Sequence, residues 1–152
     1  MKNRGFEVVA DKHRKHLDKS INIPKRGSKT SAGYDFYSTE TFTLKHGEKF
    51  VVWTDIKAYM LEGEVLNIYV RSSIGIKKGL VLANGTGIID QDYYNNPSND
   101  GNIGICLINI SKEEVTIEEG ERIAQAIFIQ FLPADNGNSL EERKGGLGST
   151  GE

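Results

Sequence analysis

The most compact group of phosphate-binding side chains in this sequence is Arg71-Ser72-Ser73. It follows the β-branched and aromatic stretch 66–70 and opens segment 72–78, which we predict to be a short helix. One guanidinium, two hydroxyls and the free N–H groups of a helix start make a compact site for phosphate oxygens. Capping of the helix by Ser72 would explain the serines without any ligand. The tripeptide alone leaves both interpretations open.

A second group lies in the stretch Asn84-Gly-Thr-Gly-Ile-Ile-Asp90-Gln-Asp92-Tyr93. Its glycine and asparagine content is typical of a tight hairpin, in which Gly85 and Gly87 let the backbone come close to a ligand. Asp90 or Asp92 is suited to act as a base or to bind a metal ion. A turn that carries two solvated acids is the alternative.

The end of the chain, Gly145-Gly-Leu-Gly-Ser-Thr-Gly151, is a run of backbone donors suited to wrapping phosphate, although a flexible linker has the same composition. From residue 135 onward only Leu140 and Leu147 are sizeable apolar groups, too few to offset the entropy of ordering. We therefore predict a single β domain over 1–133 and a flexible C-terminal arm over 134–152.

The elements that must position these groups are short, rich in β-branched and aromatic residues, and separated by Gly, Asn or Asp. They predict strands at Phe6–Ala10, Tyr34–Tyr37, Thr41–Leu44, Lys49–Thr54, Leu66–Val70, Leu80–Ala83, Ile103–Ile110, Val115–Ile117 and Ile123–Phe131. Many short strands with closely spaced turns indicate an all-β barrel, sandwich or jelly roll, with the one short helix at 72–78.

Composition bounds the remaining possibilities. The 152 residues suit one domain, and a net charge of −2 with 26% charged residues gives no basic field for nucleic acid or a membrane surface. The basic stretch Lys12–Lys29 is interpreted as a solvated loop, and His13, His16 and His46 as surface residues.

The cysteine content and the apolar runs indicate where the protein works. Cys106 is the only cysteine, so no intrachain disulfide can form, and its apolar neighbours predict a buried side chain. No run has the apolar length of a signal peptide or a membrane span. A reducing, cytoplasmic location is expected.

Five stretches follow one another along the chain: Ala32–Ser38, Arg71–Gly79, Gly87–Tyr93, Gly120–Gln125 and Gly145–Gly151. Together they resemble the five motifs of the trimeric dUTPase family, in the family's order and over nearly the whole chain, in a subtype of Gram-positive bacteria or their phages. The resemblance implies a β jelly roll that forms a homotrimer with three-chain sites. It also implies hydrolysis of dUTP to dUMP and pyrophosphate.

The resemblance implies a role for each site residue. Asp90 would be the general base that activates the attacking water, and the phosphates would be held by Arg71, Ser72 and Ser73. Asp35 and Gln125 would hold Mg²⁺ through its bound waters, and Gln125 would also lie against the substrate. The uracil pocket would be formed by Asn84, Gly87, Ile88, Ile89 and Gly104, with Tyr93 against the deoxyribose. The arm would close over the substrate through Arg143, Leu147, Gly148, Ser149 and Thr150.

Three features depart from the family pattern. Arg143 lies one residue closer to the glycine pair than is common, and Lys144 would share its role. Leu147 stands where an aromatic usually stacks on uracil, a function that Tyr94 would then have to supply. Residues 94–100 form an insertion before Gly101, and with that alignment Gly104 lies on the strand that pairs across the uracil hairpin.

Two other functions are considered. The nearest rival, dCTP deaminase, shares the fold but needs a glutamate near the pyrimidine, where this chain has Asp90. A phage-type regulatory module would bind a repressor protein through the basic stretch 12–29 or the 94–100 loop, which are more simply explained as solvated loops.

Overall fold

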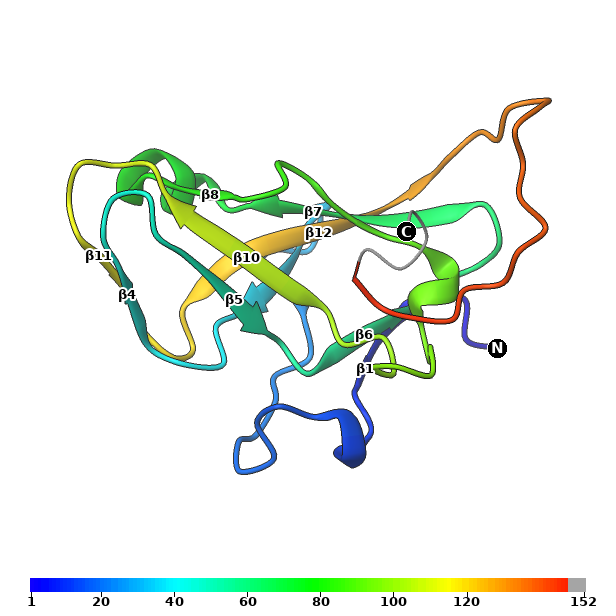
Figure 1. The fold of residues 1–152 in the computed structure, drawn as a ribbon, viewed down its shortest axis with the longest axis horizontal. Coiled ribbons are helices and arrows are strands. Elements are labelled where there is room, and N and C mark those ends of the chain that lie inside the picture. Colours follow the sequence, from blue (N-terminus) through cyan, green and yellow to red (C-terminus); the bar gives the residue numbers. More distant parts are fainter. Residues whose placement is uncertain (148–152) are drawn as a thin grey trace.

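The computed structural model describes residues 1–147, and this part of the chain consists almost entirely of short β-strands (Figure 1). In chain order they are β1 (Gly5–Val8), β2 (Lys25–Arg26), β3 (Tyr34–Tyr37), β4 (Phe42–Leu44), β5 (Lys49–Trp53), β6 (Ile56–Tyr59), β7 (Glu64–Val70), β8 (Leu80–Leu82), β9 (Gly87–Ile89), β10 (Gly104–Asn109), β11 (Val115–Ile117) and β12 (Arg122–Gln130). Every predicted strand is present within two residues at either end. Strands β2, β6 and β9 are additional to the prediction.

Antiparallel pairing joins these strands into sheets. The largest has the order β2-β3-β12-β7-β9, and a second has the order β5-β10-β8. Strands β1 and β6 form one two-stranded sheet, and β4 and β11 form another. In Figure 1, β10 crosses in front of β12. The result is a packed arrangement of antiparallel strands, as predicted for a jelly roll.

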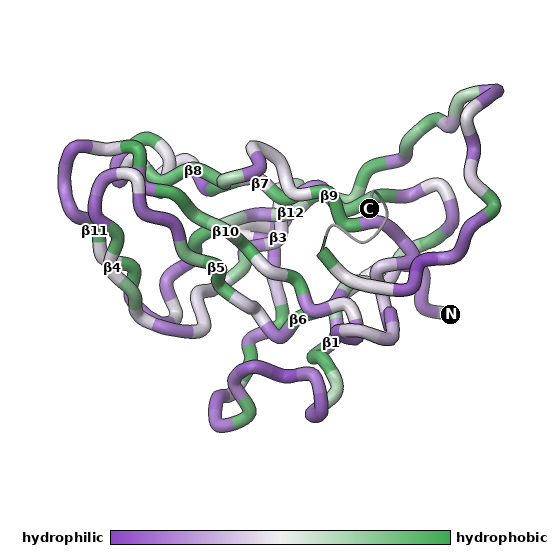
Figure 2. Tube along the Cα trace, in the orientation of Figure 1, coloured by the Kyte–Doolittle hydropathy of each residue, from purple (hydrophilic) through white to green (hydrophobic). Residues whose placement is uncertain are grey.

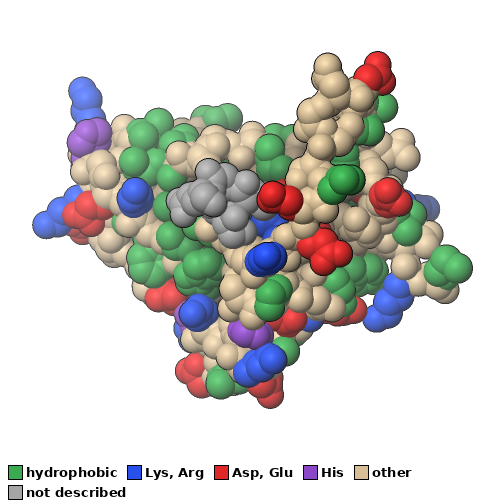
Figure 3. Space-filling view, turned by 45° about the vertical axis from the view of Figure 1, so that its right-hand side comes forward, with side chains coloured by type: hydrophobic (Ala, Val, Ile, Leu, Met, Phe, Trp, Pro, Cys, Tyr) green, Lys and Arg blue, Asp and Glu red, His purple; other side chains and the backbone are tan. Residues whose placement is uncertain are grey.

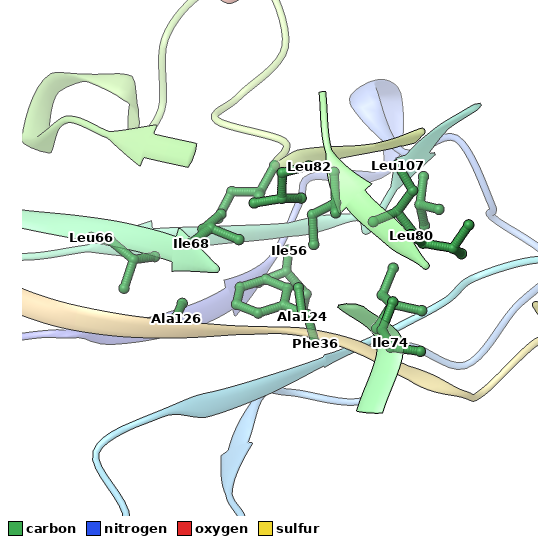
Figure 4. Close-up of a cluster of buried hydrophobic side chains, with 14 of the residues drawn as sticks. Phe36, Ile56, Leu66, Ile68, Ile74, Leu80, Leu82, Leu107, Ala124 and Ala126 are labelled. Atoms are coloured by element: carbon green, nitrogen blue, oxygen red, sulfur yellow. The ribbon is translucent and has the colours of Figure 1, made fainter. Parts of the chain in front are cut away.

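The hydrophobic core lies between these sheets. Ile68 of β7 lies beside Leu82 and Leu107 lies beside Leu80, while Phe36 packs beside the small residue Ala124, its register partner on β12 (Figure 4). Strand β10 alternates, so that its odd-numbered residues from 105 to 109 are buried. Cys106 therefore points away from the core and is only half-buried, which corrects the prediction that it is buried.

The helical content is limited to single turns. The predicted helix at 72–78 is present as a π-helical turn over Ser73–Lys77. Two 3₁₀ turns, η1 (Asp11–His13) and η3 (Gln91–Tyr93), were not predicted, because three residues are too few to show a helical period. Within residues 1–147, no helix is long and apolar enough to cross a membrane.

The basic stretch at 12–29 is hydrophilic along much of its length (Figure 2), yet part of it is tightly held. Asp55 is fully buried and accepts hydrogen bonds of 2.8 Å from the backbone N–H groups of Lys15 and His16. The Arg14 guanidinium lies 3.6 Å from the Asp55 carboxylate and donates to two nearby backbone carbonyls. Arg14 and His16 are thus half-buried beside the buried Asp55, which corrects their interpretation as solvated or surface side chains.

Candidate active site

Arg71 and Asp35 form the centre of a basic cluster at one end of the largest sheet. Arg71 follows β7, and its Nε lies 3.2 Å from Oδ1 of Asp35, a buried residue of β3. Arg122 at the start of β12 places Nη1 3.4 Å from the other oxygen of Asp35. Two guanidiniums on one carboxylate leave a net positive charge, which suits an anionic ligand. Arg122 is absent from the predicted site, although it lies within the fourth motif.

Gln125 is a neighbour of this cluster, since the β3–β12 register places it opposite Asp35. The approach of Gly33 to its side chain is close: a Cβ on Gly33 would lie 2.5 Å from Oε1 of Gln125. A larger residue at position 33 would therefore displace Gln125. Asp35 and Gln125 are brought together as the sequence predicted.

The serines after Arg71 are not helix caps. The side chain of Ser72 makes no capping hydrogen bond to the π-helical turn that it precedes. Ser72 is exposed and Ser73 half-buried, and neither hydroxyl is bonded to a protein group within the described residues. The capping interpretation is thus wrong, and both hydroxyls are free to bind a ligand beside the two arginines. We call Asp35, Arg71, Ser72, Ser73, Arg122 and Gln125 the phosphate half of the site.

The stretch 84–93 is a turn between two sheets. The strands on either side of it do not pair with each other, as they would in the tight hairpin that was predicted. Gly85 has a positive φ of 74° and donates to the carbonyl of Leu82. Strand β8 before the turn pairs with β10, whereas β9 after it pairs with β7. Gly104 begins β10 and is opposite Trp53 of β5, and β10 pairs further along with β8, the strand that leads into the turn. We call residues 84–93, together with Gly104, the base half of the site.

Asp90 and Asp92 lie after β9 with more than half of each side chain exposed. Both are paired with the same residue of the arm: Arg143 lies 2.9 Å from Asp90 and 2.7 Å from Asp92. The guanidinium also lies over the Tyr93 ring, 5.6 Å from its centroid, and Arg143 is only 9% exposed. Within one chain, the arm is therefore anchored to the base half and not to the phosphate half.

Acidic side chains predominate in the groove around this anchor, and Figure 3 shows several acidic side chains on this side of the molecule. The groove between arm and turn is lined by two basic residues, Arg143 and Lys144, and by the acids Glu62, Glu64, Asp90, Asp92, Glu141 and Glu142. Such a surplus of negative charge repels a triphosphate. An anionic ligand is better accommodated by the arginines of the phosphate half.

Tyr93 and Tyr94 point in different directions. Tyr93 is buried, its hydroxyl donates to the carbonyl of Asn102 at 2.6 Å, and burial raises its pKa. Tyr94 donates to Glu7 at 2.7 Å and meets the Tyr59 ring edge to face, with centroids 6.0 Å apart. Burial and the hydrogen bond to Glu7 raise the pKa of Tyr94 to about 12. Because Tyr94 packs on β1 and β6, it is not placed to stack on a base at its own chain's turn.

The arm residues of the predicted lid are only partly described. Leu147 is 81% exposed, so in its own chain it covers no part of the base half. Gly148, Ser149 and Thr150 lie outside the described residues. No cluster of three or more His, Cys, Asp or Glu side chains suited to a metal ion occurs in residues 1–147.

The two halves of the site are far apart in one chain. Gln125 of β12 is opposite Asp35 of β3 on one side and Tyr69 of β7 on the other. Asp90 comes directly after Ile89 of β9, which is opposite Leu66 of β7. Asp35 and Asp90 are three strands apart across the sheet, at about 4.8 Å per strand, and four residues apart along it, at about 3.3 Å per residue. The distance between them is therefore ~20 Å. Asp90 is therefore remote from the phosphate half of its own chain.

Known proteins share both the sequence and the fold. The dUTPase family model matches residues 19–151. A deoxyuridine 5'-triphosphate nucleotidohydrolase of Lactococcus lactis is 52% identical over 153 residues, which is 99% of each chain. The solved dUTPase of Streptococcus mutans is 43% identical, with a TM-score of 0.74 over 87% of this chain and 99% of that one. The solved dUTPase of phage phi11 of S. aureus is 25% identical, with a TM-score of 0.71 over 92% and 97% of the two chains. The five motifs, the all-β fold and these matches agree, and the chain belongs to the dUTPase family.

Proposed function

We propose that this dUTPase hydrolyses dUTP to dUMP and pyrophosphate at a site shared between chains, with Asp90 of one chain facing the phosphate half of another. The observation that carries the proposal is the separation of ~20 Å between Asp35 and Asp90. A general base must lie within hydrogen-bond reach of the water it activates. Asp90 can meet a phosphate held at Arg71 when a second copy brings its base half to that cluster.

The chemistry follows from the two halves. Asp90 accepts a proton from a water molecule whose oxygen attacks the α-phosphorus. The bond from that phosphorus to the bridging oxygen breaks, and pyrophosphate leaves. Arg71, Ser72 and Ser73 bind the phosphate oxygens, where negative charge grows in the transition state. Arg122 is a further positive group within reach of the same oxygens, through its pairing with Asp35.

Mg²⁺ fits the donor set of the phosphate half. The family generally acts on Mg-bound dUTP, and the ion prefers oxygen ligands and retains several waters. One carboxylate and one amide, Asp35 and Gln125, are too few to enclose the ion but suffice to hold its waters, while the triphosphate supplies direct ligands. When bound, the ion neutralises phosphate charge. Arg71 and Arg122 meanwhile fix the Asp35 carboxylate in place.

Specificity for deoxyuridine resides in the base half. Backbone groups of residues 84–89 and of Gly104 would bind the uracil edge, and the narrow turn would exclude the thymine methyl. A cytosine would leave a backbone group unpaired, at a cost of about 1–3 kcal/mol. The ring of Tyr93 would pack on the deoxyribose and leave no space for a 2′-hydroxyl.

Arg143 of the arm would exchange its two carboxylate partners for a phosphate when the nucleotide binds. Arg143 pairs with Asp90 and Asp92, and the γ-phosphate of a bound nucleotide would compete for the same guanidinium. Release from Asp90 would free the base at the moment when the substrate is covered. Leu147, Gly148, Ser149 and Thr150 would then close over the nucleotide, in the same chain or a neighbouring one.

We further propose that the assembly is a homotrimer. The phosphate half and the base half of one chain would belong to two different sites. In a closed ring of identical chains, the same contact between neighbours would complete every site. A single chain has no complete site on this account, and separated monomers are expected to be inactive.

The direct test is incubation with dUTP, dTTP, dCTP or UTP in the presence of Mg²⁺, followed by identification of the products. We expect hydrolysis of dUTP to exceed that of the other three nucleotides by orders of magnitude. Comparable turnover of dTTP would contradict the uracil pocket. Release of ammonia from dCTP would favour the deaminase alternative.

A further inference from the structure

The loop at 94–101 contains one side chain that contacts the hydroxyl of Tyr93. Nδ2 of Asn99 lies 2.8 Å from the phenolic oxygen and donates to it, while the same hydroxyl donates to the carbonyl of Asn102. A phenol that both donates and accepts is satisfied in both roles, so its ring is held at the hydroxyl end as well as at the backbone. Burial raises the pKa of Tyr93, which keeps the phenol neutral and able to donate.

The amide of Asn99 is itself fixed in orientation. Its Oδ1 accepts from Nδ2 of Asn96 at 2.7 Å and from the backbone N–H of Gly101 at 3.0 Å. With Oδ1 occupied on that side, Nδ2 is directed at Tyr93. Asn96 is buried and also donates to the carbonyl of Tyr93 at 2.8 Å. The loop therefore grips Tyr93 at both ends of the residue.

The arm passes over the same amide. A Cβ on Gly146 would lie 2.8 Å from Nδ2 of Asn99, so the arm backbone is in close contact with the group that holds the tyrosine. Arg143 covers the face of the Tyr93 ring from the same segment. Asn99 thus lies between the tyrosine hydroxyl and the glycine-rich part of the arm.

We propose that Asn99 is a positioning residue that sets the selectivity of this enzyme for deoxyribose over ribose. The proposal rests on the proposed function, in which the Tyr93 ring excludes the 2′-hydroxyl. Steric exclusion of the 2′-hydroxyl requires that the Tyr93 ring stays in place. The hydrogen bond from Asn99 fixes the hydroxyl end of that ring. Loss of that bond lets the ring tilt, so that UTP is admitted while dUTP still fits.

The test is Asn99→Asp, which keeps the shape and both Oδ1 contacts but removes the donor. The single phenolic proton of Tyr93 cannot then serve both the Asn102 carbonyl and the carboxylate at position 99, so one of the two hydrogen bonds that hold the ring is lost. We expect kcat/KM for UTP to rise and the ratio of kcat/KM for dUTP over UTP to fall about threefold to tenfold, the effect of one net hydrogen bond. Damage to the fold would lower both activities together and would not raise turnover of UTP. Ser98→Ala is the matched control, because the Ser98 hydroxyl bonds to Asn96 and not to Tyr93. Its ratio should be that of the wild type.

Two further variants separate this inference from the function on which it rests. Tyr93→Leu removes the ring and should raise UTP turnover; if it does not, the role of Tyr93 itself is wrong. In a Tyr93→Phe background, Asn99→Asp should have no further effect on the ratio, because the hydrogen bond is already gone. If Tyr93→Leu relaxes selectivity while Asn99→Asp leaves the ratio unchanged or lowers both activities in parallel, Asn99 is not a positioning residue.

Discussion

Subunit mixing tests the division of the site between chains. Asp90→Asn removes the proposed base while keeping its shape, and Arg71→Ala removes the main phosphate ligand from the other half. Each homo-oligomer lacks one group in every site, and loss of a general base lowers kcat by roughly 10²–10⁴. Because Asp35 and Asp90 are ~20 Å apart in one chain, the intact halves of two different mutants can meet in a mixed assembly.

The size of the recovery follows from random assembly. In an equal mixture, each site has a one-in-two chance of an intact Arg71 and an independent one-in-two chance of an intact Asp90. In a cyclic oligomer whose sites join two chains, about a quarter of all sites should therefore be complete. Mixed assemblies should show about a quarter of wild-type turnover, at least tenfold above either mutant alone.

The assay is co-refolding of the two mutants from denaturant at equal concentration, followed by measurement of pyrophosphate release from dUTP. The control is the same experiment with Asp90→Asn chains and Asp90→Asn/Arg71→Ala chains, in which no site can be complete. Activity of the first mixture that does not exceed that of the separately refolded mutants would refute a shared site. In that case Asp90 and Arg71 act within one chain, or one of them is not needed for the reaction.

Three further predictions concern the arm and the loop. Truncation before Arg143 should leave the fold intact by circular dichroism and lower kcat/KM about tenfold or more, the loss expected from about 1.4 kcal/mol of transition-state binding; full activity would show that the arm has no catalytic role. Leu147→Phe should leave dUTP turnover unchanged, because the side chain is 81% exposed and meets no neighbour that a ring would strike; a large loss would contradict that placement. For Asp100, burial raises the pKa but is outweighed by the Ala10 N–H and Lys57, so the pKa is lowered from 3.8. The stability from this pairing is present above that value and lost as the pH falls through the folded pKa, so Asp100→Asn should flatten the dependence of Tm on pH below about pH 4. An unchanged slope would show that Asp100 contributes nothing.

Much of the fold was predictable because strands leave a local signal. Residues 34–37 and 115–117 were assigned with their observed bounds, since β-branched and aromatic residues are bounded there by turn formers. Strand β6 was missed because Ile56–Tyr59 contains a buried Lys57, whose ammonium pairs with Asp100. A partner 43 residues away leaves no trace in the local pattern.

The proximity of Asp35, Arg71 and Gln125 was predictable, but the arrangement of the other candidate groups was not. The motif order placed Asp35, Arg71 and Gln125 correctly together, because each lies in or beside a strand of one sheet. The sequence predicted a self-paired hairpin at 84–93, yet β8 and β9 join different sheets. Turn residues specify a reversal of the chain, but the partner of each flanking strand is decided by the packing of the whole sheet.

The same limit explains why the ~20 Å between Asp35 and Asp90, which supports the proposed shared site, follows from the sheet register. The motifs implied a site made by three chains only through their resemblance to a family. The motifs identify the candidate side chains. The distance between those side chains depends on the register of β7 with β12 and with β9. A shift of that register by two residues, which preserves the buried face, would change the distance along the sheet by about 7 Å. The observed register places the arginine cluster at one end of β7 and Asp90 at the other. Under the proposed function, an isolated chain with this register has no site in which both sets of groups meet, and assembly is the step that would join them.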